Sequence, residues 1–123
     1  MKAIWLIGCG PMAIEYAKVL MDMGLKFSVI GRSQESALFF QKQFPKNVEV
    51  FHGGVEQFVI NRESADIAII AVGVTELANV VVTCVNVGIK KILVEKPGAL
   101  TRQKFQQLVV IAKKQNASIV VAY

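Results

Sequence analysis

Histidine and cysteine are scarce in this sequence. Its 123 residues include one histidine, His52, and two cysteines, Cys9 and Cys84. A single histidine excludes a metal site with several histidine ligands within one copy of the chain, and two isolated cysteines match neither a disulfide framework nor a zinc motif. We therefore expect no bound metal, and we expect both cysteines to be packing residues in a reducing compartment.

Long apolar runs and concentrated charge are also missing. No stretch approaches the length of a membrane-spanning helix, and the apolar residues before Gly8 are too few for the core of a signal peptide. The net charge of +5 is spread along the chain, without the basic runs and interleaved aromatics of nucleic-acid-binding proteins. These absences predict a cytoplasmic protein without membrane or nucleic-acid partners. The positive charge suits a small anionic ligand; the alternative is an ordinary solvated surface.

The most informative motif lies near the N-terminus. An apolar segment, 2–7, is followed by a G-x-G-x-x-A turn and by a helical pattern over 11–23. The turn consists of Gly8, Cys9, Gly10, Pro11, Met12 and Ala13. Such a turn between a strand and a helix is typical of a pyrophosphate site, because free amides and the positive end of the helix dipole face the anion.

Each small residue of this turn has a predicted purpose. Gly8 would permit the tight turn, Gly10 would let the phosphates approach the backbone, and Ala13 would let the helix pack closely on the strand. All six residues of the motif are therefore predicted to contact or shape a cofactor site. The alternative is a simple tight turn without a ligand. The position of Cys9 beside a helix N-terminus also leaves open an acidified thiol.

Strand-like and helix-like segments alternate along the whole chain. Expected strands cover 2–7, 27–30, 48–51, 67–72, 92–94 and 118–122, and expected helices cover 11–23, 33–44, 55–60, 75–87 and 101–115. This alternation predicts an α/β fold with a doubly wound, parallel, six-stranded sheet, the Rossmann fold, in one domain over 1–123.

The carboxyl ends of parallel strands share one rim of the sheet, and ligands bind there. Besides the glycine turn, this rim would receive Gly31-Arg32-Ser33, Ala71-Val72-Gly73 and Glu95-Lys96-Pro97. We therefore predict that these three segments contact the cofactor.

The end of the second strand bears on the choice of nucleotide. A carboxylate at this point would bind the adenosine ribose of NAD and repel an extra phosphate, but here Ile30-Gly31-Arg32-Ser33 has none until Glu35. Arg32 could pair with the 2′-phosphate of NADP, and Ser33 could donate a hydrogen bond to it. NADP is the predicted cofactor, with NAD as the second choice. The alternative is that Arg32 is a surface residue and Ser33 only a helix cap.

Lys96 is the predicted catalytic residue. At the carboxyl end of a strand, its amine could hydrogen-bond a substrate hydroxyl or carbonyl and move the proton of that oxygen as hydride is transferred. Pro97 would stiffen the turn that follows. The alternative is an exposed Glu95–Lys96 pair in front of a turn proline.

The glycine turn and Glu-Lys-Pro together resemble the Gfo/Idh/MocA oxidoreductase family over the whole chain. This resemblance implies an NAD(P)-dependent oxidoreductase that acts on a sugar, a cyclitol or a related small molecule, with Lys96 in the substrate and nicotinamide site. The chain departs from the family at Val72-Gly73-Val74, where Thr-Pro-Asn is usual, and at Leu77, where histidine is usual.

The resemblance also implies a second, mostly β domain, which the 123 residues do not contain. We therefore interpret the chain as the cofactor domain of a longer enzyme, inactive alone and homo-oligomeric when complete. Three alternatives remain: a non-catalytic dinucleotide sensor, a nucleoside-cofactor methyltransferase, which the absence of an acidic residue after the second strand disfavours, and a protein-interaction module.

Overall fold

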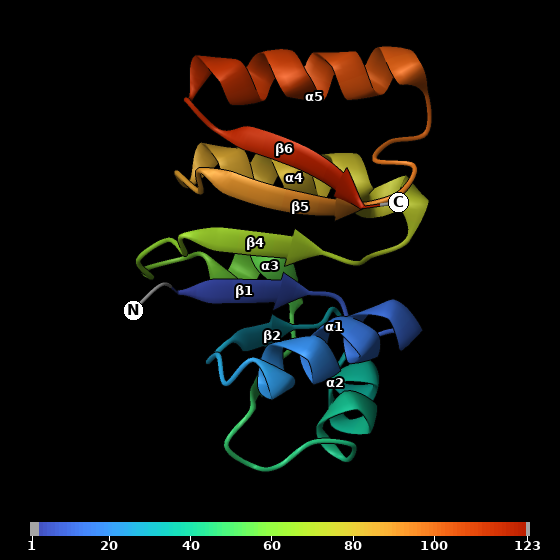
Figure 1. Cartoon of the computed structure of the whole chain (residues 1–123), viewed down its shortest axis with the longest axis vertical. Helices are drawn as coiled ribbons and strands as arrows, with labels where there is room; N and C mark the ends of the chain where they lie inside the picture. Colours follow the sequence, from blue (N-terminus) through green and yellow to red (C-terminus); the bar gives the residue numbers. More distant parts are fainter. Residues whose placement is uncertain (1–2, 123) are drawn as a thin grey trace.

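The computed structural model describes residues 3–122, and it confirms the predicted α/β Rossmann fold. In these residues, one parallel sheet has the strand order β3-β2-β1-β4-β5-β6, with helices in the connections (Figure 1). The strands are β1 (Ile4–Ile7), β2 (Ser28–Ile30), β3 (Glu49–Phe51), β4 (Ile67–Ile70), β5 (Lys91–Glu95) and β6 (Ser118–Ala122). The helices are α1 (Pro11–Asp22), α2 (Gln34–Gln41), α3 (Gly54–Phe58), α4 (Val74–Asn86) and α5 (Arg102–Lys114).

The strand order reverses in the middle of the sheet. β1 pairs with β2 on one side and with β4 on the other, so that Leu6 lies opposite both Val29 and Ile69. After β3 the chain crosses to β4 and builds outward in the other direction. All strand arrows in Figure 1 point the same way, and the loops after β1 and β4 diverge at their carboxyl ends. This divergence creates the crevice where ligands of doubly wound sheets bind.

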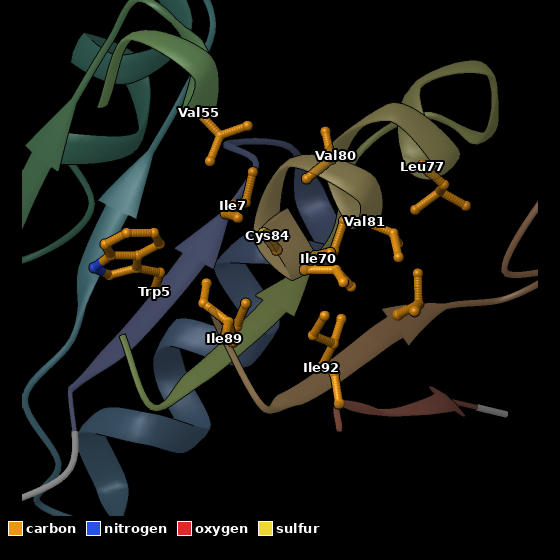
Figure 2. Close-up of a cluster of buried hydrophobic side chains, with 14 of the residues drawn as sticks. Trp5, Ile7, Val55, Ile70, Leu77, Val80, Val81, Cys84, Ile89 and Ile92 are labelled. Atoms are coloured by element: carbon orange, nitrogen blue, oxygen red, sulfur yellow. The ribbon is translucent and has the colours of Figure 1, made fainter. Parts of the chain in front are cut away.

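Apolar side chains cover both faces of the sheet. On β1, Ile4 and Leu6 pack with α1 and α2, whereas Trp5 and Ile7 belong to the larger cluster on the opposite face, with α3, α4 and α5. Figure 2 shows this larger cluster, in which side chains from α4 fill the space above the strands. Successive strand residues point to opposite faces, so an apolar run such as β1 indicates burial on both sides.

Several element boundaries differ from the predicted ones. β4 ends at Ile70, because Ala71 and Val72 leave the sheet and line the rim. The second helix was expected to reach residue 44, but α2 ends at Gln41, and tighter turns follow in which Phe44 N–H donates to Gln41 C=O. The proline at position 45 disfavours helical conformation in the residue before it. The start of the first expected strand, at residue 2, lies outside the described residues.

The turn after β1 requires glycine at its first position. Gly8 has a φ of +125°, and a Cβ built there would lie 2.1 Å from the carbonyl oxygen of Ala71. The Gly8 amide also donates to Ile30 C=O at 2.9 Å, while Ala71 N–H donates to Ile7 C=O at 2.8 Å. The backbone of this turn is thus held directly against β2 and the end of β4.

Replacement of Gly8 by alanine is expected to destabilise the fold. The new methyl group would clash with Ala71 C=O and force an unfavourable φ, which together should lower the free energy of unfolding by roughly 3 kcal/mol or more. Gly10→Ala is the matched control, since the Cβ position at Gly10 has no atom within 4 Å among residues 3–122. Urea unfolding of both variants provides the measurement. An equal loss of unfolding free energy in Gly8→Ala and Gly10→Ala would contradict the proposed clash.

Candidate functional site

The centre of the rim is the turn between β1 and α1. Gly10 is the N-cap of α1, with extended backbone, and Pro11 occupies the first helical turn. Within the described residues, no side chain caps this helix and no acidic residue lies in its first turn. The Cβ direction of Gly10 is open. First-turn amides and the positive end of the helix dipole therefore face open space, as a bound diphosphate requires.

A first cavity of about 580 Å³ lies on the β2 and β3 side of this turn. Its lining combines the backbone of Gly8, Cys9 and Gly10 with side chains from several other elements. These include Arg32 after β2, Ser36 on α2 and Glu76 on α4. The charged residues of the lining are Arg32, Glu56 and Glu76. One guanidinium thus lies among two carboxylates.

Arg32 and Glu76 form an ion pair across this cavity. The Nη1 atom of Arg32 pairs with Oε1 of Glu76, and the side chains are 74% and 29% exposed, respectively. Such exposed pairs add little stability, so the guanidinium remains able to change partners.

Ser33 is the N-cap of α2. Its Oγ accepts a hydrogen bond from Ser36 N–H at 3.1 Å and donates one to Ser36 Oγ at 2.9 Å. Ser36, three residues later, is among the residues that line the cavity, whereas Ser33 is not. Ser33 therefore caps α2, as the alternative stated, while its predicted contact with a 2′-phosphate stays a prediction.

The loop after β3 also reaches the first cavity. Gly53 N–H donates to Arg32 C=O and Gly54 N–H donates to Gly31 C=O, both at 3.0 Å. Gly53 and Gly54 have positive φ values of +104° and +84°, a conformation that glycine adopts without steric cost. These bonds fix the β3–α3 loop against the end of β2 and add both glycines to the lining.

Gly31 and Cys9 fit together at the bottom of this region. A Cβ on Gly31 would lie 2.6 Å from Cys9 Sγ, so the missing side chain makes room for the sulfur. Burial raises the pKa of the Cys9 thiol to about 11, which keeps it protonated at neutral pH. The hypothesis of an acidified Cys9 thiol is therefore wrong, because desolvation disfavours the thiolate. Cys84 is fully buried in the core, as a packing residue would be.

A second cavity of about 800 Å³ lies on the β5 side of the turn. It shares Gly10, Ala71, Val72 and Gly73 with the first cavity. Its other lining residues come from α1, from the end of β5 and from the end of β6, and include Pro11, Met12, Tyr16, Glu95, Lys96 and Ala122. The two cavities thus meet at the point where the strand order reverses.

Glu95 and Lys96 stand at one end of the second cavity. The Tyr16 hydroxyl of α1 donates to Glu95 Oε1 at 2.9 Å, which joins the helix to the end of β5. Burial, this hydrogen bond and the charge of Glu95 raise the pKa of Tyr16 to about 12, so the phenol remains a donor at neutral pH. Lys96 is exposed and lines the cavity.

Most of the residues predicted for the site come together at the rim. Ala13, Gly31, Ser33 and Pro97 lie outside the linings of both cavities. Ala13 is a fully buried residue of α1 that packs with residues of the sheet, and Gly31 acts through the space it leaves for Cys9. The sequence reasoning missed Tyr16, Ser36, Gly53, Gly54, Glu56, Glu76 and Asn79. Of these residues, only Gly53 and Gly54 carry a local sequence signal, which is a pair of adjacent glycines just after the third strand.

Among residues 3–122, no group of three or more His, Cys, Asp or Glu side chains is placed to hold a metal ion. In the same part of the chain, no helix is both long and apolar enough to cross a bilayer.

Solved structures of oxidoreductases share this fold. The WlbA dehydrogenase of Chromobacterium violaceum, solved with NADH and UDP-GlcNAcA, is 18% identical, with a TM-score of 0.85 over 98% of this chain and 34% of its own. A biliverdin reductase from Synechocystis, solved with biliverdin and NADP⁺, is 21% identical, with a TM-score of 0.79 over 97% of this chain and 37% of its own.

A Gfo/Idh/MocA oxidoreductase from Vibrio cholerae is 19% identical, with a TM-score of 0.84 over 100% of this chain and 39% of its own. The chain therefore spans little more than a third of the length of these structures. No curated protein matches the sequence.

The family assignment comes from the sequence match. Residues 2–123 match the description of an oxidoreductase family with an NAD-binding Rossmann fold. This match extends over nearly the whole chain and agrees with the glycine turn, the strand order and the divided cavity at the rim. The chain therefore belongs to the Gfo/Idh/MocA oxidoreductase family, of which it comprises the NAD-binding Rossmann fold.

Proposed function

We propose that this chain is the cofactor domain of an oxidoreductase that prefers NADP and transfers hydride to or from a sugar, a cyclitol or a related small molecule. The observation that supports this best is the pair of cavities joined at Gly10 and at Ala71, Val72 and Gly73. A dinucleotide has two bulky ends and an anionic centre, and this rim offers two spaces with an uncapped helix N-terminus between them.

Each end of the dinucleotide has a proposed place. The first cavity would hold the adenosine end, with Arg32 available to a 2′-phosphate and Ser36 near it. The second cavity would hold the nicotinamide end and the substrate, beside Glu95 and Lys96. The bound nicotinamide would supply the hydride chemistry. The chain itself would bind, orient and exclude water through the apolar walls at Ile7, Ile30, Ala71 and Val72.

Lys96 is the proposed proton-transfer residue. Its exposed amine at the mouth of the second cavity can reach a substrate oxygen, hydrogen-bond to it and give or take its proton. Tyr16 would serve as a positioning residue, because its bond to Glu95 fixes the backbone turn that presents Lys96. The sugar-type substrate remains a proposal from the family; the WlbA structure holds a nucleotide-linked sugar acid.

Gly10→Ala tests the central claim. The added methyl group would occupy the space that a diphosphate needs, so affinity for both NADPH and NADH is expected to fall by about tenfold or more. Isothermal titration gives both affinities. Val110→Ala is the control, because this side chain of α5 is 53% exposed and lies outside the linings of both cavities. Unchanged affinities in a folded Gly10→Ala variant would argue against this site.

Arg32→Asp tests cofactor preference. Replacing the guanidinium by a carboxylate should repel a 2′-phosphate and shift the NADPH-to-NADH affinity ratio toward NADH by roughly tenfold to a hundredfold. Arg102→Asp makes the same charge change at the exposed start of α5, outside both cavities, and should leave the ratio nearly unchanged. An equal shift in both variants would show that only net charge matters.

Lys96→Ala tests the catalytic role and separates an enzyme from a non-catalytic sensor. In the full-length protein proposed to contain this domain, turnover with NADP⁺ and a panel of sugars and cyclitols is expected to fall by roughly 10²–10⁴-fold, with cofactor affinity kept within about threefold. Lys96→Arg retains the charge but exchanges protons poorly, and should also be slow. Rates come from the absorbance of the reduced nicotinamide. Full activity in Lys96→Ala would remove this residue from the mechanism, while a full-length parent protein that turns over no substrate would favour the sensor.

A further inference from the structure

The charged residues that line the first cavity include more carboxylates than cations. Of the three charged side chains in its lining, Arg32 is the single cation, and Glu56 and Glu76 are both carboxylates. At neutral pH these side chains sum to one net negative charge. The sequence around Arg32 gives no sign of this, because Glu76 reaches the cavity from α4, two strands away in the sheet.

Glu76 is the carboxylate that engages Arg32. The ion pair joins the loop after β2 to the first turn of α4 across the mouth of the cavity. Glu56 lies in the first turn of α3 and lines the same cavity, but it has no ion pair within the described residues. Within the described residues, Glu76 is therefore paired with the guanidinium of Arg32, and Glu56 is not.

We propose that Glu76 is a second determinant of cofactor choice, which limits the preference for NADP by holding Arg32 away from the 2′-position. This inference rests on the proposed function of the site. A 2′-phosphate must draw Arg32 away from Glu76 and lies near a carboxylate of its own sign. A 2′-hydroxyl is neutral and leaves the pair intact. Breaking the Arg32–Glu76 ion pair therefore lowers the affinity for NADPH and does not affect the affinity for NADH.

Both partners are accessible enough for this exchange. With 74% of the Arg32 side chain exposed, the guanidinium can swing between the carboxylate and a phosphate without disturbing the core. The fork of an arginine suits a phosphate at least as well as a carboxylate, so the exchange is close in energy and sensitive to a single charge. Because solvent screens exposed charges, the effect should be moderate in size and should weaken with salt.

The test compares Glu76→Gln with Glu56→Gln in the purified protein. Dissociation constants for NADPH and NADH are measured by isothermal titration at low salt, with thermal unfolding as a check on folding. Glu76→Gln should raise the preference for NADPH over NADH by about threefold to tenfold, almost entirely through tighter NADPH binding. Glu56→Gln removes the same charge from the same cavity and should change the ratio by less than about twofold.

An Arg32→Ala background shows whether Glu76 acts through the guanidinium. In that background, the increase in NADPH preference caused by Glu76→Gln should be less than half of the increase in the parent protein, because no ion pair remains to be opened. A gain of equal size in that background, an equal gain in Glu56→Gln, or no gain in Glu76→Gln while both cofactors bind would each overturn this inference alone. Failure of the parent protein to bind either NADPH or NADH would instead overturn the proposed function, and this inference with it.

Discussion

The site depends on one close backbone approach, between the turn after β1 and the end of β4. Gly8 makes it possible, since its φ of +125° and missing side chain let the turn pack directly on Ala71 C=O. The open Gly10, the first amides of α1 and the shared wall at 71–73 all follow from this contact. A centre built from backbone is already in place before an anion arrives, so binding there requires little reordering of side chains.

Charged side chains lie at the two ends of this centre, and each end is held from a different part of the chain. At the proposed adenosine end, Arg32 in the loop after β2 meets Glu76 from α4. At the other end, Tyr16 from α1 holds Glu95, the neighbour of Lys96. In the proposed function, recognition of the diphosphate is therefore a property of the fold, whereas the choice of nucleotide and the chemistry depend on side chains that can vary while the fold stays the same.

The comparison with known structures agrees with this separation. Structures only 18–21% identical superimpose with TM-scores of 0.79–0.85, because the fold requires apolar periodicity, small residues under α1 and glycine at the turn, and tolerates many sequences that supply them. This chain has Val72-Gly73-Val74 after β4, and Val72 and Gly73 line both cavities as part of their shared wall.

Local patterns in the sequence determined the element types, the parallel doubly wound sheet and the glycine turn, because period-two and helical periodicities and turn residues act over short distances. They also placed Arg32 and Lys96 at the rim, because parallel strands end on the same side. Only the tertiary structure decided which residues from separate elements meet. Glu76 opposite Arg32, Tyr16 on Glu95 and the sulfur of Cys9 beside Gly31 all depend on how α1 and α4 pack on the sheet. No sequence pattern encodes such contacts, because they are fixed by the relative positions of helices and strands far apart in the chain.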